Sequence, residues 1–372
     1  MEGNKIKILH MTPPNINNGV YRYIFNHMRY MDMQKYQFAF LTKGAAELKL
    51  TKEYQEYGFA VYMLQNTQRN NREELRKEIV SVLSRGYDVI HLHTSSWRGF
   101  LIEQIAVEMG IRKVIVHSHS SGIDVADDTE RKKQMEEHKK YRDQFSMEYA
   151  TDVCACSALA ADWLFGSRIP RKQIQILPNA IDVERYRFNP KKRQEIRRFL
   201  NLENRIVIGN VGRYSYQKNQ EFLVRAFAQA HVRNTSLFLL CMGEGKQLKH
   251  LVELIKQLNI EDSVLCMEWQ ENVEDYLQAM DTFCLPSKFE GLPISAIEAQ
   301  AAGVRCLISD TVTREIQITD LVKFLPLKEV YWIEELAESE IDRYRDRQDE
   351  EIARAGYDIR IAAERLEELY RN

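Results

Sequence analysis

Short apolar runs alternate with longer amphipathic segments along the chain. In the first half the apolar runs are strand-sized and rich in Ile, Val and Leu, and they cover 5–11, 37–42, 60–64, 89–93, 113–117, 152–157 and 173–177. Helix-like segments lie between them, as at 20–31, 72–85, 101–109 and 158–164. This alternation predicts parallel strands that helices bury on both faces.

The same alternation restarts after a charged stretch at 185–198. The second series of apolar runs covers 206–211, 237–242, 263–266, 282–285, 304–308 and 323–324. We therefore expect an α/β protein with two Rossmann-like, doubly wound parallel-sheet domains, at 1–183 and 184–355. A C-terminal helix within 356–372 is expected to pack back on the first domain through Ile361, Leu366 and Leu369. Ligands of such sheets bind at the carboxyl ends of the strands.

Two glutamates follow the apolar run at 282–285. Glu290 stands before a helix expected to begin near Pro293, and Glu298 lies within that helix. The N–H groups and the positive dipole end of a helix start suit a phosphate. At about 100° per residue, the eight-residue spacing predicts two carboxylates on roughly one side, where they grip two parts of one extended ligand. The alternative is a dipole partner at Glu290 and a solvated helix residue at Glu298.

A second glycine-bearing turn follows the run at 206–211. It carries Arg213 and Lys218, five residues apart. The arginine fork can bind phosphate oxygens and the lysine adds a point charge. The alternative is a pair of surface cations with no ligand. The turn is not a dinucleotide fingerprint, because the G-x-G-x-x-G spacing is absent.

Together the two motifs resemble the retaining glycosyltransferases of family 4, which have the GT-B fold of two Rossmann-like domains facing a central cleft. The resemblance rests on Glu-x7-Glu after Pro-Ser, preceded by Val-Gly-Arg-x4-Lys. It extends over nearly the whole chain, through the loop 17–20 and the segment 178–182. The segment 116–121 is most similar to members that build bacterial capsular and exopolysaccharides.

The resemblance implies a role for each matched residue. Glu290 would hold hydroxyls of the transferred sugar, and Glu298 would hold the ribose hydroxyls. His119 would reach the donor sugar near the reacting carbon. The residues implied at the diphosphate are Arg213 and Lys218, the N–H groups around Gly291, Leu292 and Ile294, and Gly19, which would let a first-domain loop approach the β-phosphate.

The resemblance also implies a reaction. A hexose would pass from a nucleotide-diphosphate sugar, expected to be a UDP-sugar, to a glycan or lipid-linked saccharide in polysaccharide biosynthesis. Front-face attack would retain the anomeric configuration without a metal or other cofactor. Two alternatives stay open, namely a non-catalytic donor-binding subunit and another GT-B enzyme such as an epimerase. Three departures from the family pattern are Ala180, Asn18 and the segment 268–270, and the last of these leaves the base undetermined.

Composition narrows the class of protein. A formal net charge of −2 argues against a nucleic-acid binder. No apolar run reaches the length of a membrane span, and the first residues do not resemble a secretory signal. The scattered cysteines lack paired spacing, so we expect reduced thiols and a cytoplasmic location. The basic stretches at 131–140 and 185–198 are either solvated helix faces or weak contacts to the inner face of a membrane.

Two His-x-His pairs need a separate interpretation. His91 and His93 end one apolar run, and His117 and His119 end another. Alternate residues share a face of a strand, so four imidazoles could form a metal site. The simpler interpretation is a donor contact for His119 and packing for the others, and we expect no metal.

Overall fold

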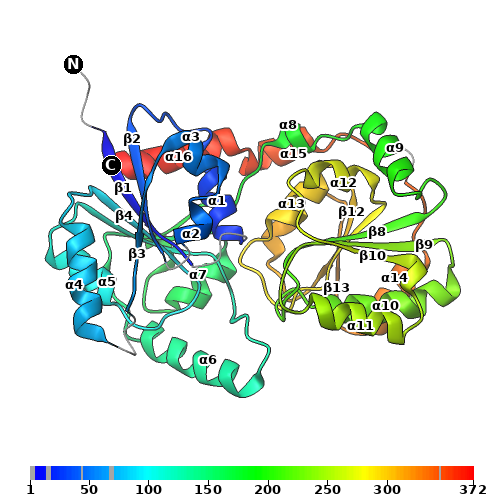
Figure 1. Ribbon diagram of the computed structural model, residues 1–372, viewed down its shortest axis with the longest axis horizontal. Helices are drawn as coiled ribbons and strands as arrows, with labels where there is room; N and C mark the ends of the chain where they lie inside the picture. The colour runs from blue at the N-terminus through cyan, green and yellow to red at the C-terminus, as the bar shows by residue number, and fades with distance from the viewer. Residues whose placement is uncertain (1–4, 14–17, 43–44, 67–70, 343–344) are drawn as a thin grey trace. The chain divides into compact units, whose positions relative to one another are not determined.

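The computed structural model describes residues 5–13, 18–42, 45–66, 71–342 and 345–372. It divides into two compact units (Figure 1). Unit 1 consists of Met1–Ile123, Thr129–Asn179 and Ile359–Asn372, and unit 2 of Asp124–Asp128 and Ala180–Asp358.

Unit 1 contains a seven-stranded sheet in the order β3-β2-β1-β4-β5-β6-β7. Its strands are β1 Ile6–Met11, β2 Tyr36–Thr42, β3 Ala60–Met63, β4 Val89–Thr94, β5 Lys113–Ser118, β6 Asp152–Ala155 and β7 Ile174–Ile176. Every pairing is parallel, and the strand order reverses between β1 and β4. A doubly wound sheet opens a crevice at the carboxyl ends of the two strands where the order reverses.

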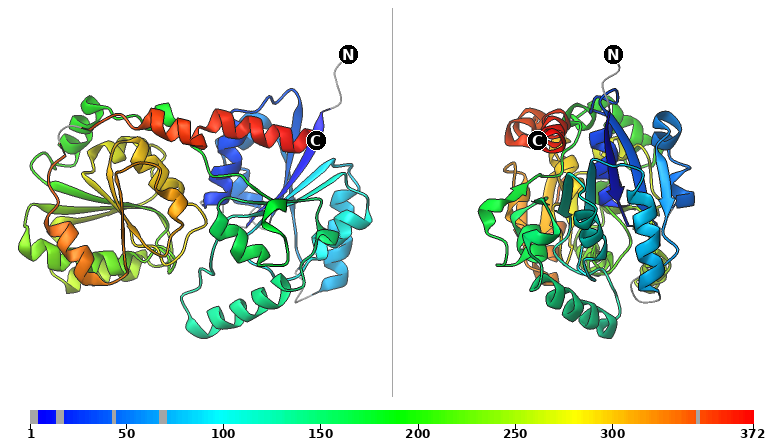
Figure 2. Two further views of the ribbon diagram at one scale, coloured as in Figure 1. Left: turned by 180° about the vertical axis from the view of Figure 1, so that it is seen from behind. Right: turned by 90° about the vertical axis from the view of Figure 1, so that its left-hand side faces the viewer.

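Helices cover both faces of this sheet (Figure 2). The helices of this unit are α1 Gly19–Met28, α2 Ala45–Leu48, α3 Lys52–Tyr57, α4 Arg72–Leu83, α5 Leu101–Glu108, α6 Asp128–Arg142, α7 Ala158–Phe165 and α16 Ile359–Arg371, of which α6 lies apart from the sheet. Side-chain oxygens of Asn18, Thr51, Asn71 and Ser157 cap four of these helices at their first turns. None of the helices in the described part of the chain combines the length and the apolar character that a bilayer span requires.

Unit 2 contains a six-stranded parallel sheet in the order β10-β9-β8-β11-β12-β13. Its strands are β8 Ile206–Val211, β9 Leu237–Met242, β10 Val264–Met267, β11 Thr282–Leu285, β12 Arg305–Ser309 and β13 Val322–Leu325. The order reverses between β8 and β11, which are the strands that precede the two motifs. All the strands expected in both halves are present, so the doubly wound α/β fold class is confirmed.

The helices of unit 2 flank its sheet in the same way (Figure 1). They are α8 Val183–Tyr186, α9 Pro190–Phe199, α10 Gln220–Arg233, α11 Leu248–Gln257, α12 Val273–Ala279, α13 Ile294–Ala301, α14 Glu329–Ala337 and α15 Asp349–Ile352.

Part of the basic stretch at 185–198 is buried rather than on the surface. Arg193 and Arg197 of α9 both pair with Asp281, which directly precedes β11, and the Arg197 Nη1 to Asp281 Oδ2 distance is 3.0 Å. The same carboxylate accepts the N–H of Val207 at 2.7 Å. A buried carboxylate needs such partners, because leaving it uncompensated would cost several kcal/mol, on the order of 3–5. Arg193 and Arg197 therefore belong neither to a solvated helix face nor to a membrane contact, the two interpretations offered for this stretch.

Helix α16 packs against α1 within unit 1, but not through all the expected positions. Leu366 and Leu369 are 2% and 6% exposed, whereas Ile361 is 41% exposed. Ile361 lies five residues from Leu366, which turns it about 140° away on a helix. The buried face instead follows spacings of three and four residues through Ile359 and Ala363. The expectation that Ile361 lies on the packing face of this helix was therefore wrong.

This difference gives a matched pair of variants. We expect Leu366→Ala to lower the free energy of unfolding of unit 1 by about 2–5 kcal/mol, because it opens a cavity in the core. Ile361→Ala on the same helix should change that free energy by about 0.5 kcal/mol or less. Chemical denaturation followed by tryptophan fluorescence measures both, since Trp97 is buried in unit 1. Equal losses would contradict the packing of α16.

Candidate functional site

A buried carboxylate lies where the loops after β8 and β11 meet. Glu290 is 6% exposed and accepts a hydrogen bond from Ser287 Oγ at 2.7 Å. Gln217 Nε2 donates to its other oxygen at 2.9 Å, and Lys218 Nζ lies 2.7 Å from Oε1. Two of the expected site residues, Glu290 and Lys218, are thus directly paired. Sequence reasoning missed Gln217 and Ser287, although both stand within the quoted motifs.

Arg213 lies in the same loop as Lys218 and also has an acidic partner. Its Nη2 lies 3.1 Å from Asp124 Oδ2, in the segment 124–128 that belongs to unit 2. The other oxygen of Asp124 accepts the backbone N–H of Gln217 at 2.9 Å. Arg213 and Lys218 are therefore each paired with a carboxylate, which balances their positive charges.

Two glycines after β9 allow the neighbouring loop to approach closely. Gly243 has a φ of +157°, and a β-carbon there would lie 2.0 Å from the carbonyl oxygen of Gly212. Gly245 has a φ of +146°, and its β-carbon would lie 2.4 Å from the carbonyl oxygen of Tyr214. Glycine at both positions lets the loop after β9 pack closely against the backbone on either side of Arg213.

Glu298 lies in a different environment from Glu290. It is fully buried in α13, and Tyr186 Oη donates to its Oε1 at 2.8 Å. Because α13 begins at Ile294, Glu290 belongs to the preceding loop and the angular argument that joined the two carboxylates does not apply. The alternative of a solvated Glu298 is also wrong. Gly291, Leu292 and Ile294 are buried around the start of α13.

In unit 1, Gly19 is the first residue of α1. A β-carbon at this position would meet no atom within 4 Å, so packing alone does not demand glycine here. Asn18 caps the helix by accepting the N–H groups of Val20 and Tyr21 at 2.8 and 3.2 Å. This cap gives Asn18, one of the three departures from the family pattern, a structural role at the start of α1. Asn17 of the same loop lies outside the described residues.

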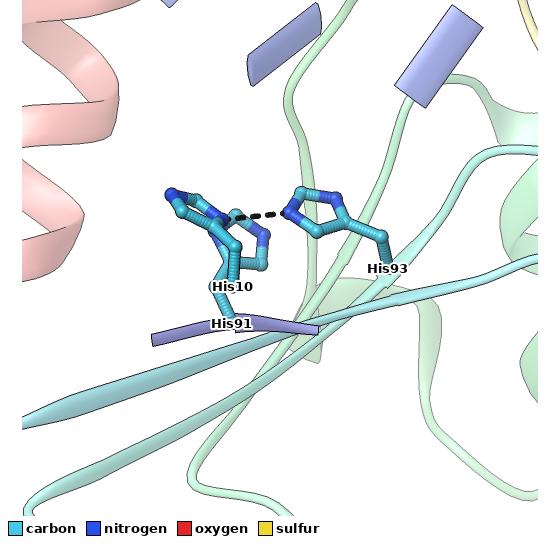
Figure 3. A group of neighbouring side chains, drawn as sticks. All are labelled: His10, His91 and His93. Atoms are coloured by element: carbon cyan, nitrogen blue, oxygen red, sulfur yellow. Dashed lines mark hydrogen bonds between the residues drawn. The ribbon is translucent and has the colours of Figure 1, made fainter. Parts of the chain in front are cut away.

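A histidine cluster lies on one face of β1, β4 and β5. His10 pairs in register with His91, and His93 with His117, while His119 directly follows β5. His10 Nδ1 lies 2.9 Å from His93 Nε2 (Figure 3), and His93 Nδ1 lies 2.8 Å from His119 Nε2. Sequence reasoning missed His10, because an isolated histidine in an apolar run gives no signal until the strand order is known.

Burial determines the charge of these rings. It lowers the pKa of His10 and of His119 to about 3, and it lowers the pKa values of His91, His93 and His117 well below the usual range. All five imidazoles are therefore neutral at physiological pH.

The cluster has the geometry of a metal-binding group. One ring nitrogen from each of His10, His91 and His93 lies within 4.8 Å of the others, and the same holds for His93, His117 and His119. Neutral imidazole is also the form that binds a metal. The expectation that no metal takes part in the reaction stays a prediction.

Comparison with known proteins gives two family matches. The model described as "Glycosyltransferase Family 4" matches residues 17–185, and "Glycosyl transferases group 1" matches residues 192–348. The putative glycosyltransferase EpsF of Bacillus subtilis is 27% identical over 96% of this chain and 94% of its own length.

Two further comparisons concern proteins whose names or structures include a uridine nucleotide. An Escherichia coli UDP-Gal:alpha-D-GlcNAc-diphosphoundecaprenol alpha-1,3-galactosyltransferase is 23% identical over 82% of this chain and 80% of its own length. The crystal structure of Anabaena HepE in complex with UDP and glucose has a TM-score of 0.76 at 16% identity, over 98% of this chain and 99% of that one.

The glycine geometry predicts a contrast in stability. We expect Gly19→Ala to leave the free energy of unfolding unchanged or to raise it by up to about 1 kcal/mol, since the site is open and alanine restricts the unfolded chain. Gly245→Ala should lower the free energy of unfolding of unit 2 by about 2 kcal/mol or more, because its β-carbon meets backbone. Thermal denaturation of both variants tests this, and a stable Gly245→Ala protein would refute the close approach.

Proposed function

The chain belongs to the glycosyltransferases of family 4, and from this premise we propose that it moves a hexose from a UDP-sugar to a glycan or lipid-linked saccharide, with retention of the anomeric configuration. The observation that carries the proposal is the buried Glu290, paired with Lys218 at the carboxyl ends of β8 and β11. Support for the donor comes from HepE, whose structure contains UDP and glucose. The lipid-linked acceptor follows the name of the E. coli relative.

Unit 2 is proposed to bind the nucleotide sugar, within the expected domain 184–355. Lys218 and Arg213 would hold the diphosphate together with the N–H groups at Gly291, Leu292 and Ile294. The start of α13 adds the positive end of a helix dipole. A bound diphosphate would replace Asp124 as the anionic partner of Arg213.

The two glutamates are proposed to hold different parts of the donor. Glu290 would accept hydrogen bonds from hydroxyls of the transferred sugar. Its negative charge would stabilise the positive charge that develops at the reacting carbon in the transition state. Glu298 would accept the ribose hydroxyls. Tyr186 Oη already donates a hydrogen bond to Oε1 of Glu298, and Oε2 of Glu298 is buried. Ribose binding at Glu298 therefore requires the residues that cover this carboxylate to move.

The chemical step is proposed as front-face displacement. The bond between the sugar carbon and the β-phosphate oxygen breaks, and the acceptor oxygen bonds to the same face of that carbon. The proton of the acceptor hydroxyl passes to the leaving phosphate oxygen. Lys218, Arg213 and the helix start stabilise the charge of the leaving UDP, which is the task a metal performs in other transferases.

Unit 1 is proposed to contribute the acceptor side, within the expected domain 1–183 and the helix at 356–372. Gly19 would leave room for the β-phosphate and His119 would contact the sugar. Basic residues in the last turn of α6 (Lys139, Lys140 and Arg142) are proposed as a weak peripheral contact to the membrane that holds a lipid-linked acceptor.

Activity is tested directly with a panel of UDP-sugars and mass spectrometry of the products. We expect one donor to be consumed with release of UDP. A non-catalytic donor-binding subunit would instead be stabilised against heat by the donor without releasing UDP.

The two glutamates should differ in kinetics. Glu290→Gln keeps the size of the side chain but not its charge, so kcat should fall about 10²-fold, equivalent to roughly 2.7 kcal/mol, while UDP still binds. Glu298→Ala should mainly raise the KM for the donor and weaken UDP binding. Tyr186→Phe is the control, because it removes one contact and keeps the Glu298 carboxylate.

Calorimetry with UDP measures these affinities without knowledge of the acceptor. Equal losses in the Glu290 and Glu298 variants would contradict the division between sugar and ribose. Unchanged affinity in both would place the nucleotide elsewhere.

We expect the reaction to proceed in EDTA at the rate seen without it, because protein cations stabilise the leaving charge. The measurement is UDP release before and after chelation. Activity that is lost in EDTA and restored by Mn²⁺ or Mg²⁺ would contradict this and favour a metal in the histidine cluster.

A further inference from the structure

Three imidazoles of unit 1 form one continuous row of hydrogen bonds. The row runs from His10 to His93 at 2.9 Å and from His93 to His119 at 2.8 Å. Each neutral ring carries one N–H and one bare nitrogen, and each link between two rings needs one proton. Three rings therefore supply one proton for each of the two links and one for a single end of the row.

This proton count allows only two states of the row. In the first, each ring holds its proton on Nδ1, and the row ends in a bare Nε2 at His10 and an N–H at His119. In the second, each ring holds its proton on Nε2, and the row ends in an N–H at His10 and a bare Nδ1 at His119. The environment of the two ends decides between these states.

The His10 end of the row favours the first state. His10 Nε2 is buried, and no described residue offers it a hydrogen-bond partner. The ring stacks against Phe38 and Phe40 of the neighbouring strand, each with a centroid distance of 5.5 Å. Buried N–H groups without an acceptor are rarer in proteins than acceptors without a donor, so the proton should not lie there. His119 is less buried than His10, so its outer nitrogen is under a weaker constraint.

We propose that His10 and His93 are positioning residues that hold His119 in its Nδ1–H tautomer, so that this ring presents a hydrogen-bond donor to the transferred sugar. The proposal rests on the proposed function for the identity of the ligand, but not for the tautomer. It implies that the sugar must offer an oxygen acceptor, such as a hydroxyl or an N-acetyl carbonyl, at the position facing His119. A sugar that lacks oxygen there should be a poor donor.

A second row of side chains supplies a matched control. Tyr370 Oη lies 2.8 Å from His91 Nδ1, and His91 Nε2 lies 3.1 Å from His117 Nδ1. His91 and His93 are both buried, and their rings stack at a centroid distance of 4.2 Å. Among the described residues His91 forms hydrogen bonds with Tyr370 and His117 and none with His119, so His91→Leu removes a comparable imidazole without breaking the first row.

Nitrogen NMR of the full chain labelled at histidine tests the tautomer without any substrate. We expect His119 to be neutral and protonated on Nδ1, although free histidine in water prefers Nε2–H. His93→Leu should release this preference, and His91→Leu should not. His93→Asn should retain it, because its amide can donate from about the position of Nδ1. Protonation of His119 on Nε2, a metal-bound nitrogen signal, or equal effects of His93→Leu and His91→Leu would overturn the proposal.

A kinetic cycle with UDP-glucose as the probe tests the link to the sugar. His93→Leu should lower kcat/KM for UDP release about tenfold, the loss of one hydrogen bond, and should not change UDP affinity. In a His119→Ala background the same change should have no further effect. Additive losses would show that His93 acts on the fold alone and would overturn the positioning role.

These two experiments separate the tautomer from the proposed function. Should the wild-type chain fail to turn over any UDP-sugar, the proposed transferase activity fails while the NMR result still decides the tautomer.

Discussion

The ion pair of the buried Glu290 with Lys218 is the interaction on which the candidate site of unit 2 depends. The carboxylate is compensated by Lys218 from the loop after β8 and by Ser287 from the loop after β11. A buried charge tolerates few arrangements, because each lost partner leaves the rest uncompensated. The two loops therefore stabilise each other. The fold brings the residues of the two motifs together in one place, rather than leaving them as two independent motifs.

The histidine cluster imposes a different kind of constraint on unit 1. A parallel sheet core is normally filled with aliphatic side chains, yet here β1, β4 and β5 place imidazoles on one face. Burying each ring costs desolvation, which the hydrogen bonds between the rings and the one to Tyr370 offset in part. Such an arrangement fixes protons as well as positions, which an aliphatic core cannot do.

The sequence predicts the strands well, because Ile- and Val-rich runs such as 206–211 follow from burial on both faces of a sheet. It predicts the site residues as motifs but not their partners. The pairing of Glu290 with Gln217 depends on which strand ends become neighbours, and that is a property of strand order. The misplacement of Ile361 has a simpler cause, since an apolar residue about 140° around the helix from Leu366 does not share its buried face.

The chain path has a consequence for synthesis on the ribosome. Leu366, Leu369 and Tyr370 complete the core of unit 1, yet they follow the whole of unit 2 in the sequence. Domains usually fold in the order in which they emerge, amino-terminal first. Here the amino-terminal unit stays incompletely covered until α16 has emerged, whereas all of unit 2 precedes α16 in the chain. A premature stop codon at the start of α16 would thus spare every candidate-site residue of unit 2 and still leave unit 1 a client for chaperones.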